Sequence, residues 1–503
     1  MRSKKVLKNG LSELLNQITL IIKGLIIPKL IISMYGSNIN GLVISITNFL
    51  NYIVILEMGI SPIIKSKLYK PISNNDKSKI EDILKSGNKF YNRIGFIFLI
   101  YILILLFIYP IMINNNNYLF IDSLIIVISL STIFEYFLGI IYNIYLESTG
   151  NSYLISYINI FVNIFNTIAI IILIKLNCNI VLLKLFSSLI FIIKPLFSFF
   201  YVKYKLHINI KNGKDYKFNN KWDGVSQHIA WAIHNNIDIV LLTLFSSLTN
   251  VSIYSIYSMI CISVRNVIKA ISNGIDAMFG NMIVSNEIDN LKNKFNMYEL
   301  LYYIIISVVF ICTYSLIIPF VKIYTINIKD ANYINFLFSS LIVISEFIYI
   351  IRLPYQSLVL AGGYFKETKN GAWVECILNL IISIILVIRL GLIGVIIGTI
   401  IAMLIRTIEL IVFSNKNILK REYILSFKKI FLNILGSILS INIIKYIITF
   451  NNLNYLNWIK NGIIIFILSL IIVIFWNYIF YKKELKYLCN YIKNILRSCK
   501  VGN

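Results

Sequence analysis

The sequence predicts an all-α polytopic membrane protein with about 14 transmembrane helices. Apolar stretches of about 20 residues, the length that crosses a hydrocarbon core, recur along the whole 503-residue chain. The composition agrees, because 58% of the residues are hydrophobic and the mean hydropathy is +0.79. The predicted spans cover residues 11–33, 41–61, 94–113, 118–146, 153–174, 180–201, 229–247, 251–279, 299–321, 333–360, 372–388, 391–413, 430–450 and 461–481.

The basic residues alternate between the two sides of the predicted membrane. With the N-terminus inside, the cytoplasmic segments carry 33 of the 47 lysines and arginines, the outer loops carry 5 and the spans carry 9. Short cytoplasmic loops are the ones that accumulate positive charge. The bias therefore predicts an even number of crossings in the cell inner (plasma) membrane, with both termini cytoplasmic.

The net charge of +25 does not indicate a nucleic-acid-binding protein. Most of the basic residues lie in predicted cytoplasmic loops such as 65–93 and 203–221, where they face anionic lipid headgroups. We expect no nucleic acid among the partners. The segments 77–89 and 483–497 have lysines on one face, which is typical of helices lying on the inner leaflet.

The chain carries no recognisable catalytic motif. It contains no P-loop glycine pattern, no nucleophile elbow and no zinc-ligand spacing, and no loop is long enough for a separate catalytic domain. His234 and Asp238 are four residues apart, but no matching ligand set accompanies them. We therefore expect a protein that is not an enzyme and that needs no cofactor or metal.

Three pairs of short segments resemble each other at offsets of 210, 211 and 212 residues. The pairs are 35–40 with 245–250, 133–137 with 344–348, and 146–150 with 358–362. Matches in order at nearly one offset predict two six-helix lobes with a parallel pseudo-two-fold repeat, an arrangement typical of transporters. The predicted organisation is an N-lobe (1–201), a cytoplasmic linker (202–228), a C-lobe (229–413), two extra C-terminal helices (414–481) and a basic cytoplasmic tail (482–503).

Several of the same segments carry a family resemblance. They are Pro28-x7-Gly36-x4-Gly41, Leu56-Glu57-Met58-Gly59, Asn236-Ile-Asp238 followed by Val251-Ser-Ile-Tyr254, and Arg389-Leu-Gly391-Leu-Ile-Gly394. Over residues 11–480 the chain resembles bacterial polysaccharide flippases of the multidrug/oligosaccharidyl-lipid/polysaccharide exporter superfamily. It departs from them at Glu57, where they have aspartate, and in lacking a Gly-x-x-Gly between the fifth and sixth spans.

The resemblance implies a flippase that moves a lipid-linked oligosaccharide by alternating access. The implied partners are a polyprenyl-diphosphate-linked glycan, membrane lipids and other polysaccharide-assembly membrane proteins. The glycan would be an O-antigen, capsule or related surface polysaccharide unit.

Charged residues inside the spans are costly and are therefore candidates for function. In the span 251–279, five polar residues fall within about 40° of one helical face at about 100° per residue. They are Ser258, Arg265, Lys269, Ser272 and Asp276. One interpretation is the wall of a water-filled cavity in which the two basic side chains receive an anion. The other is an ion pair that only fixes packing, either between Lys269 and Asp276 or across helices.

The other charged residues of the spans fall into two groups. The predicted cationic, substrate-binding set is Arg265, Lys269, Arg352, Lys23, Lys29 and Arg406. The acids that would couple an ion or balance these cations are Glu57, Asp238, Asp276, Glu135 and Glu346. Alternatives remain open for two of the cations. Lys29 can extend to the interface, as can Lys194, and Arg406 can simply pair with Glu409 three residues later.

Three functions are compatible with these observations. The favoured one is the flippase, because arginine and lysine in a cavity attract a diphosphate through charge-assisted hydrogen bonds. The first alternative is an ion-coupled multidrug or cation exporter of the same superfamily, against which the same positive charges argue. The second is a polysaccharide polymerase or ligase, for which the outer loops are short.

The charge bias makes a testable prediction about topology. Single cysteines, in a background without the native ones, should react with an impermeant thiol reagent only on the outer side. The predicted outer positions are Asn38, Asn115, Thr249 and Asn454, and the predicted inner positions are Lys77, Lys214, Asn290 and Lys420. Reversed access at either set would contradict the orientation.

Overall fold

We describe the protein from a computed structural model, which covers residues 2–57, 59–113, 117–216, 218, 225–450 and 453–501; the side chains of residues 2–4, 6, 225–228, 270–277, 284 and 488–501 are not described. The helices are α1 Arg2–Asn51, η1 Tyr52–Leu56, α2 Ile60–Ser73, α3 Lys77–Met112, α4 Tyr118–Leu138, α5 Ile140–Ser148, α6 Ser152–Lys175, α7 Ile180–Phe200, η2 Tyr201–Lys205, η3 Ile210–Asn212, α8 Val225–Phe245, α9 Leu248–Val284, α10 Ile288–Tyr324, α11 Phe336–Ala361, α12 Phe365–Leu390, α13 Leu392–Phe413, η4 Ser414–Ile418, α14 Ile424–Ile447 and α15 Tyr455–Val501.

The all-α polytopic fold is confirmed. Within the described residues there is no β-strand, and 12 helices are long and apolar enough to cross a membrane. One of these, Leu7–Leu56, contains two of the predicted spans, and the predicted span 229–247 is the shorter apolar helix Ile229–Phe245. Helices dominate because lipid offers no partner for backbone N–H and C=O groups, which must bond within their own segment.

The first predicted span and the first half of the second lie in one segment, α1, that bends at Gly36. This glycine has φ 86° and ψ 168°. A residue with a Cβ rarely adopts a positive φ, so glycine permits the change of direction at the predicted outer loop. Five residues later, Gly41 lies against the backbone of Leu248, where α9 begins. Both glycines of the Pro28-x7-Gly36-x4-Gly41 pattern are therefore explained by local geometry.

The predicted cytoplasmic loops are shorter in the structure, because the membrane helices extend beyond the apolar spans. The predicted interfacial segment 77–89 is helical, but it is continuous with the span as the first part of α3. Asp76 caps this helix by accepting a hydrogen bond from the Lys79 backbone N–H at 3.1 Å. Hydrogen bonds from the Lys79 backbone and side chain hold the pKa of the Asp76 carboxyl below its usual value.

The first half of the predicted linker 202–228 is attached to α3. In segment 206–216, the Asn209 backbone N–H donates to Glu81 Oε1 at 2.8 Å, and the Gly213 carbonyl accepts from Lys85 Nζ at 2.7 Å. These bonds hold the segment against the first part of α3, which precedes the predicted span. Residues 219–224 of the linker lie outside the described residues, as does Asn115 of the topology prediction.

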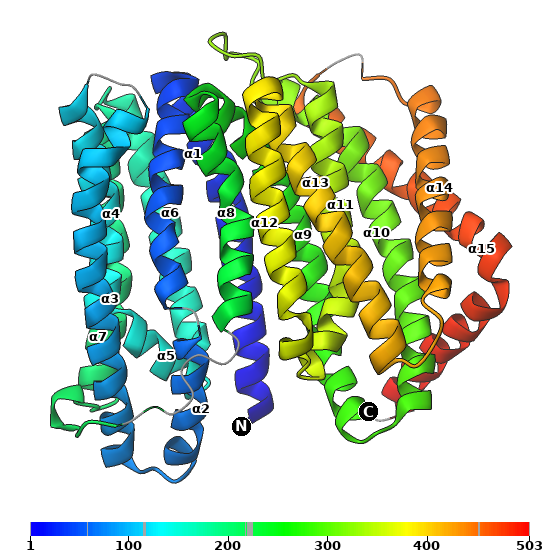
Figure 1. The fold of residues 1–503 in the computed structure, drawn as a ribbon, viewed down its shortest axis with the longest axis horizontal. Coiled ribbons are helices and arrows are strands. Elements are labelled where there is room, and N and C mark those ends of the chain that lie inside the picture. Colours follow the sequence, from blue (N-terminus) through cyan, green and yellow to red (C-terminus); the bar gives the residue numbers. More distant parts are fainter. Residues whose placement is uncertain are drawn as a thin grey trace. The chain divides into compact units, whose positions relative to one another are not determined.

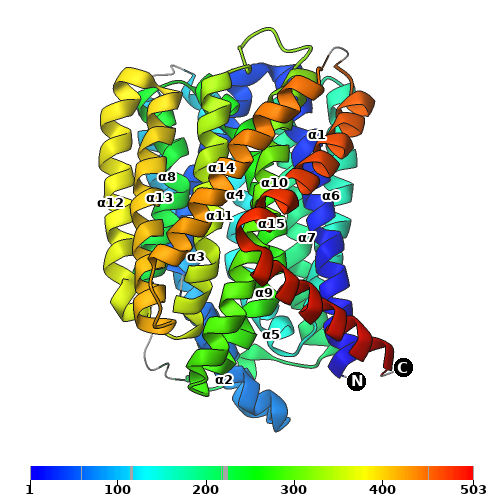
Figure 2. The ribbon, with the colours of Figure 1, turned by 90° about the vertical axis from the view of Figure 1, so that its right-hand side faces the viewer.

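The chain forms two compact units, Met1–Ser255 and Ile256–Asn503. In the first unit, α1 packs on α6 and α8, and α4 lies between α3 and α7 (Figure 1). In the second, α12 pairs with α13, α11 packs on α13, and α10 contacts α11, α14 and α15. Figure 2 shows the change of direction in α15, whose backbone leaves the helical conformation at Tyr481. The division into repeat-related lobes remains a prediction.

Large apolar side chains cover much of the surface of the membrane helices. Phe107 is 76% exposed and Leu119 is 86% exposed, whereas Phe98 and Leu124 on the same two helices are completely buried. An exposed apolar surface of this kind is stable only where lipid, a partner or another apolar medium covers it. The pattern supports a helix bundle embedded in a bilayer.

The close approach at Gly41 predicts that Gly41→Ala destabilises the protein by about 1–3 kcal/mol, the usual cost of overpacking. An added Cβ would lie 1.7 Å from the Leu248 carbonyl oxygen, so one of the two backbones must move. Gly10→Ala is the matched control, since nothing lies within 4 Å of its added Cβ. Thermal unfolding in detergent measures the melting temperatures of the two purified variants, and equal melting temperatures would contradict the prediction.

Candidate functional site

Arg265 and Glu346 form a cross-helix ion pair in the second unit. Arg265 on α9 places its Nε 3.1 Å from Glu346 Oε1 on α11, and its side chain is 16% exposed. Its guanidinium also lies over the ring of Tyr349, 4.6 Å from the ring centre. Arg265 thus forms a cross-helix ion pair and still reaches the molecular surface, and its role stays a prediction.

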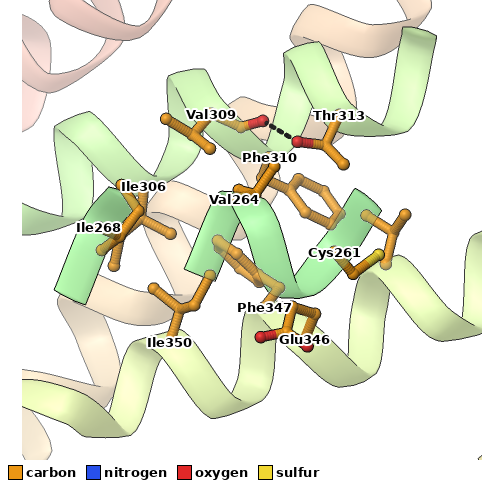
Figure 3. Close-up of a pocket in the computed structure, with 11 residues that line it drawn as sticks. Cys261, Val264, Ile268, Ile306, Val309, Phe310, Thr313, Glu346, Phe347 and Ile350 are labelled. Carbon is orange, nitrogen blue, oxygen red and sulfur yellow. Dashed lines mark hydrogen bonds between the residues drawn. The ribbon is translucent and has the colours of Figure 1, made fainter. Parts of the chain in front are cut away.

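Glu346 also lines a small apolar pocket between α9, α10 and α11 (Figure 3). The carboxyl group is the one charged group in its lining, among side chains such as Cys261, Phe310 and Phe347. The pocket has room for about 20 Å³, roughly one water molecule. A cavity of this size does not hold a glycan.

The predicted polar stripe on α9 is only partly described. Arg265 is paired, and Lys269 is exposed, one helical turn further along. Ser272 and Asp276 belong to the side chains that the structure does not describe. The alternative pair between Lys269 and Asp276 therefore stays a prediction.

A second ionic cluster joins α11, α12 and α13. Arg352 is 3% exposed and its Nη1 lies 2.5 Å from Glu375 Oε1. Arg406 places its Nε 4.0 Å from the other oxygen of Glu375 and its Nη1 2.7 Å from Glu409 Oε2. The expected pairing of Arg406 with Glu409 is confirmed. A buried charge is tolerated only when it is paired in this way.

Tyr349 links the two clusters. The guanidinium groups of Arg265 and Arg352 lie 4.6 and 4.3 Å from the centre of its ring. The resulting set contains three arginines and three glutamates, so it carries no net charge when all six are ionised. The structure therefore favours charge balancing as the role of Glu346, and it leaves Lys269 as the exposed cation of the predicted set in this unit.

A third cluster was not predicted from the sequence. Glu299 on α10 is completely buried and accepts hydrogen bonds from Arg421 Nη2 at 2.8 Å and Lys429 Nζ at 3.0 Å. Tyr355 and Ser426 donate to the same carboxylate at 2.6 and 2.7 Å. Its basic partners, Arg421 and Lys429, lie 122 and 130 residues away, just before and within the first turns of α14, so no local pattern indicates the pairing.

The first unit holds a different arrangement of charges. Lys23 on α1 donates to Asn163 Oδ1 on α6 at 3.4 Å and lies 4.2 Å from the ring centre of Phe191. Lys194 approaches the same ring at 4.7 Å. Among the described residues neither ammonium has a carboxylate within 4 Å. These two lysines are therefore less neutralised than the arginines of the second unit.

The acids of the first unit occupy separate positions. Glu135 on α4 interacts electrostatically with Lys194 and with Glu57, which follows η1. Asp238 is buried on α8 and accepts a hydrogen bond from Tyr254 at 2.8 Å. Lys29, on α1, is half-buried. The structure thus groups Lys23, Lys194 and Glu135 within one unit, and it groups the predicted arginines within the other.

The fold is shared with transporters whose structures are solved. The chain resembles the lipid II flippase MurJ in an inward closed conformation, with a TM-score of 0.68 and 15% identity over 95% of this chain and 99% of that one. It also resembles the MATE multidrug transporter DinF-BH, with a TM-score of 0.57 and 13% identity over 83% and 97% of the two chains.

An inward-facing MATE multidrug transporter of the MOP superfamily has a TM-score of 0.56 and 13% identity, covering 82% of this chain and 94% of that one. No protein-family sequence model matches the chain, and no curated protein sequence matches it. The structural neighbours are a flippase and exporters, not enzymes, and the chain has the MurJ/MATE-like polytopic fold.

The ionic clusters predict unequal effects from removing two neighbouring acids. Glu375→Ala leaves Arg352 buried without its carboxylate and should destabilise the protein by about 3–5 kcal/mol. Glu409→Ala is the control and should cost about 1 kcal/mol or less, because its side chain is 35% exposed and Arg406 keeps the Thr368 carbonyl at 2.9 Å. The two melting temperatures in detergent measure the difference, and equal losses would exclude the burial argument.

Proposed function

We propose that the protein is a flippase that moves a polyprenyl-diphosphate-linked oligosaccharide from the inner to the outer leaflet of the cell inner membrane. The glycan would be an O-antigen, capsule or related surface polysaccharide unit. The observation that most supports this proposal is the MurJ-like fold, which extends over 95% of the chain. In the proposed orientation both termini are cytoplasmic, as the distribution of basic residues predicts.

The extent of the structural likeness supports a flippase over a drug exporter. The MurJ structure covers 95% of this chain, whereas the MATE structures cover 82% and 83% of it while being almost completely covered themselves. Part of this chain therefore has no counterpart in the MATE structures. The two extra C-terminal helices predicted in 414–481 are consistent with this uncovered part of the chain. We assign these helices to a groove that binds the isoprenoid tail.

The charges inside the membrane support an anionic substrate. Lys23 and Lys194 have no carboxylate within 4 Å among the described residues, Lys269 is exposed, and Arg265 remains partly exposed beside Glu346. Ammonium and guanidinium groups bind diphosphate oxygens through charge-assisted hydrogen bonds. The same groups repel organic cations, which are the expected cargo of a multidrug exporter.

The proposed mechanism is alternating access between the predicted lobes. The sugar and the diphosphate would cross in a hydrated path that is open to one side at a time, while the tail stays in lipid. Arg352 and Arg406 are held by Glu375, so we assign them to keeping α11, α12 and α13 together. Glu57, Glu135 and Asp238, from other elements, stay candidates for the coupling of an ion.

The test of the function is a deletion strain in which lipid-linked sugar is labelled. We expect the labelled intermediate to accumulate on the inner leaflet and surface polysaccharide to disappear, with both restored by the wild-type gene. Unchanged surface polysaccharide together with increased drug susceptibility would instead identify the exporter. Polymer length changes without inner-leaflet accumulation would point to a polymerase.

The same strain tests the role of Arg265 with three variants. Arg265→Ala should lower surface polysaccharide at least about tenfold, since one charge-assisted contact is worth about 1.5–3 kcal/mol. Glu346→Gln should keep transport, because it removes the balancing acid and leaves the cation. The double variant R265A/E346Q should recover the protein level of the wild type without recovering transport.

Two outcomes would contradict this assignment. Full transport in R265A/E346Q would mean that Arg265 serves only to pair with Glu346. Equal loss of transport in R265A and E346Q, restored in the double variant, would mean the same. Protein amount in the membrane fraction, measured for every variant, separates these results from poor folding.

A further inference from the structure

A hollow in the second unit lies at one end of α10, α11, α14 and α15, and its volume is about 430 Å³. That falls within the range of pockets that bind small molecules. It lies beside the C-terminal ends of α10 and α14 and the N-terminal ends of α11 and α15, which the charge bias places on the outer side of the membrane. The site is separate from the ionic clusters described above.

Two lysines stand on the rim of this hollow. Lys322 lies in the last turn of α10 and Lys445 lies in the last turn of α14. Both positions favour a cation, because the C-terminal end of a helix carries partial negative charge. Within the described part of the chain neither ammonium forms an ion pair, and Lys322 Nζ lies 5.8 Å from the ring centre of Phe336. An anion bound here would therefore meet two available positive charges.

The rest of the lining has a polar part and an apolar part. Hydroxyl and amide groups come from Tyr314, Ser340 and Asn442, and the Ser340 hydroxyl donates to Tyr314 Oη at 3.3 Å. The apolar part is formed by side chains such as Ile441 and Ile465. A pocket with cations at its rim and an apolar wall matches a molecule that has an anionic head and a hydrocarbon chain.

The level of the two lysines relative to the membrane indicates which kind of molecule the hollow binds. Lysines near helix ends extend their ammonium groups to the level of the lipid headgroups. A phosphodiester of the bilayer lies at that level, and its acyl chain runs from there along the helices into the hydrocarbon. A free phosphate ion would leave the apolar wall uncovered, and an uncharged lipid would leave the two lysines without a counter-charge.

We propose that this hollow binds one anionic phospholipid of the outer leaflet. Lys322 and Lys445 hold its phosphodiester, and an acyl chain lies against apolar side chains of the lining such as the partly exposed Ile441. Because the four helices that line the hollow include α14 and α15, the lipid acts as a bridge that attaches these helices to α10 and α11. The inference does not depend on the proposed flippase function, since it holds equally for an exporter with the same helices.

The test is lipid binding to the purified full-length protein by native mass spectrometry, with phosphatidylglycerol and phosphatidylcholine as probes. We expect one phosphatidylglycerol to bind in preference to phosphatidylcholine and to raise the melting temperature. Lys322→Ala and Lys445→Ala should each weaken phosphatidylglycerol binding about fivefold, the effect of about one lysine charge at a membrane surface. Lys329→Ala is the matched control, because this exposed lysine lies in the adjoining loop outside the lining.

Asn442→Trp provides a second variant that leaves both charges in place. Asn442 is exposed and lines the hollow, so a tryptophan there should occupy it and exclude both lipids. Size-exclusion chromatography checks that each variant is folded, and K322Q/K445Q replaces the double variant K322A/K445A if the latter aggregates.

Three results would overturn the proposal. The first is equal binding of the two phospholipids by the wild-type protein. The second is wild-type binding of phosphatidylglycerol by the double variant or by Asn442→Trp. The third is binding of a polyprenyl phosphate at this site without binding of phosphatidylglycerol, which would assign the hollow to an isoprenoid lipid.

Discussion

Buried charge in an apolar medium is the constraint on which the second unit depends. An arginine in hydrocarbon is stable only beside a carboxylate, and the pair then fixes the distance between the helices that carry it. Glu375 on α12 pairs with Arg352 on α11 and with Arg406 on α13, and it thereby fixes the distances between these three helices. Glu299 does the same for α10 and the start of α14 through Arg421 and Lys429.

The distribution of the remaining positive charge bears on function. In the second unit Arg352 and Arg406 share the buried Glu375, so their net contribution to an anion site is small, whereas Arg265 is still 16% exposed beside Glu346. Lys23 and Lys194 of the first unit share an aromatic ring instead of a carboxylate. We therefore include both lysines among the groups proposed to bind the diphosphate, although only Lys23 belongs to the predicted cationic set.

Backbone geometry explains why the helices bend and end where they do. Hydrogen bonds within each helix satisfy the backbone in lipid, so a change of direction needs a residue that tolerates it. Gly36 provides this inside α1, and Gly391 separates α12 from α13 with φ 54°. Outside the spans the helices continue into segments predicted to be cytoplasmic, where Asp76 caps α3, because hydropathy marks the lipid boundary and not the helix end.

The sequence by itself determined the class of the protein, the approximate positions of its membrane helices and several of the charged residues within them. Hydropathy, glycine placement and loop charge are local properties, so they can be read along the chain. Only the tertiary structure decided which acid neutralises which base. Arg352 and Glu375 are 23 residues apart, and Arg421 and Glu299 are 122 apart, so their meeting depends on helix packing. The hollow beside Lys322 and Lys445 likewise exists only where four separate helices end together.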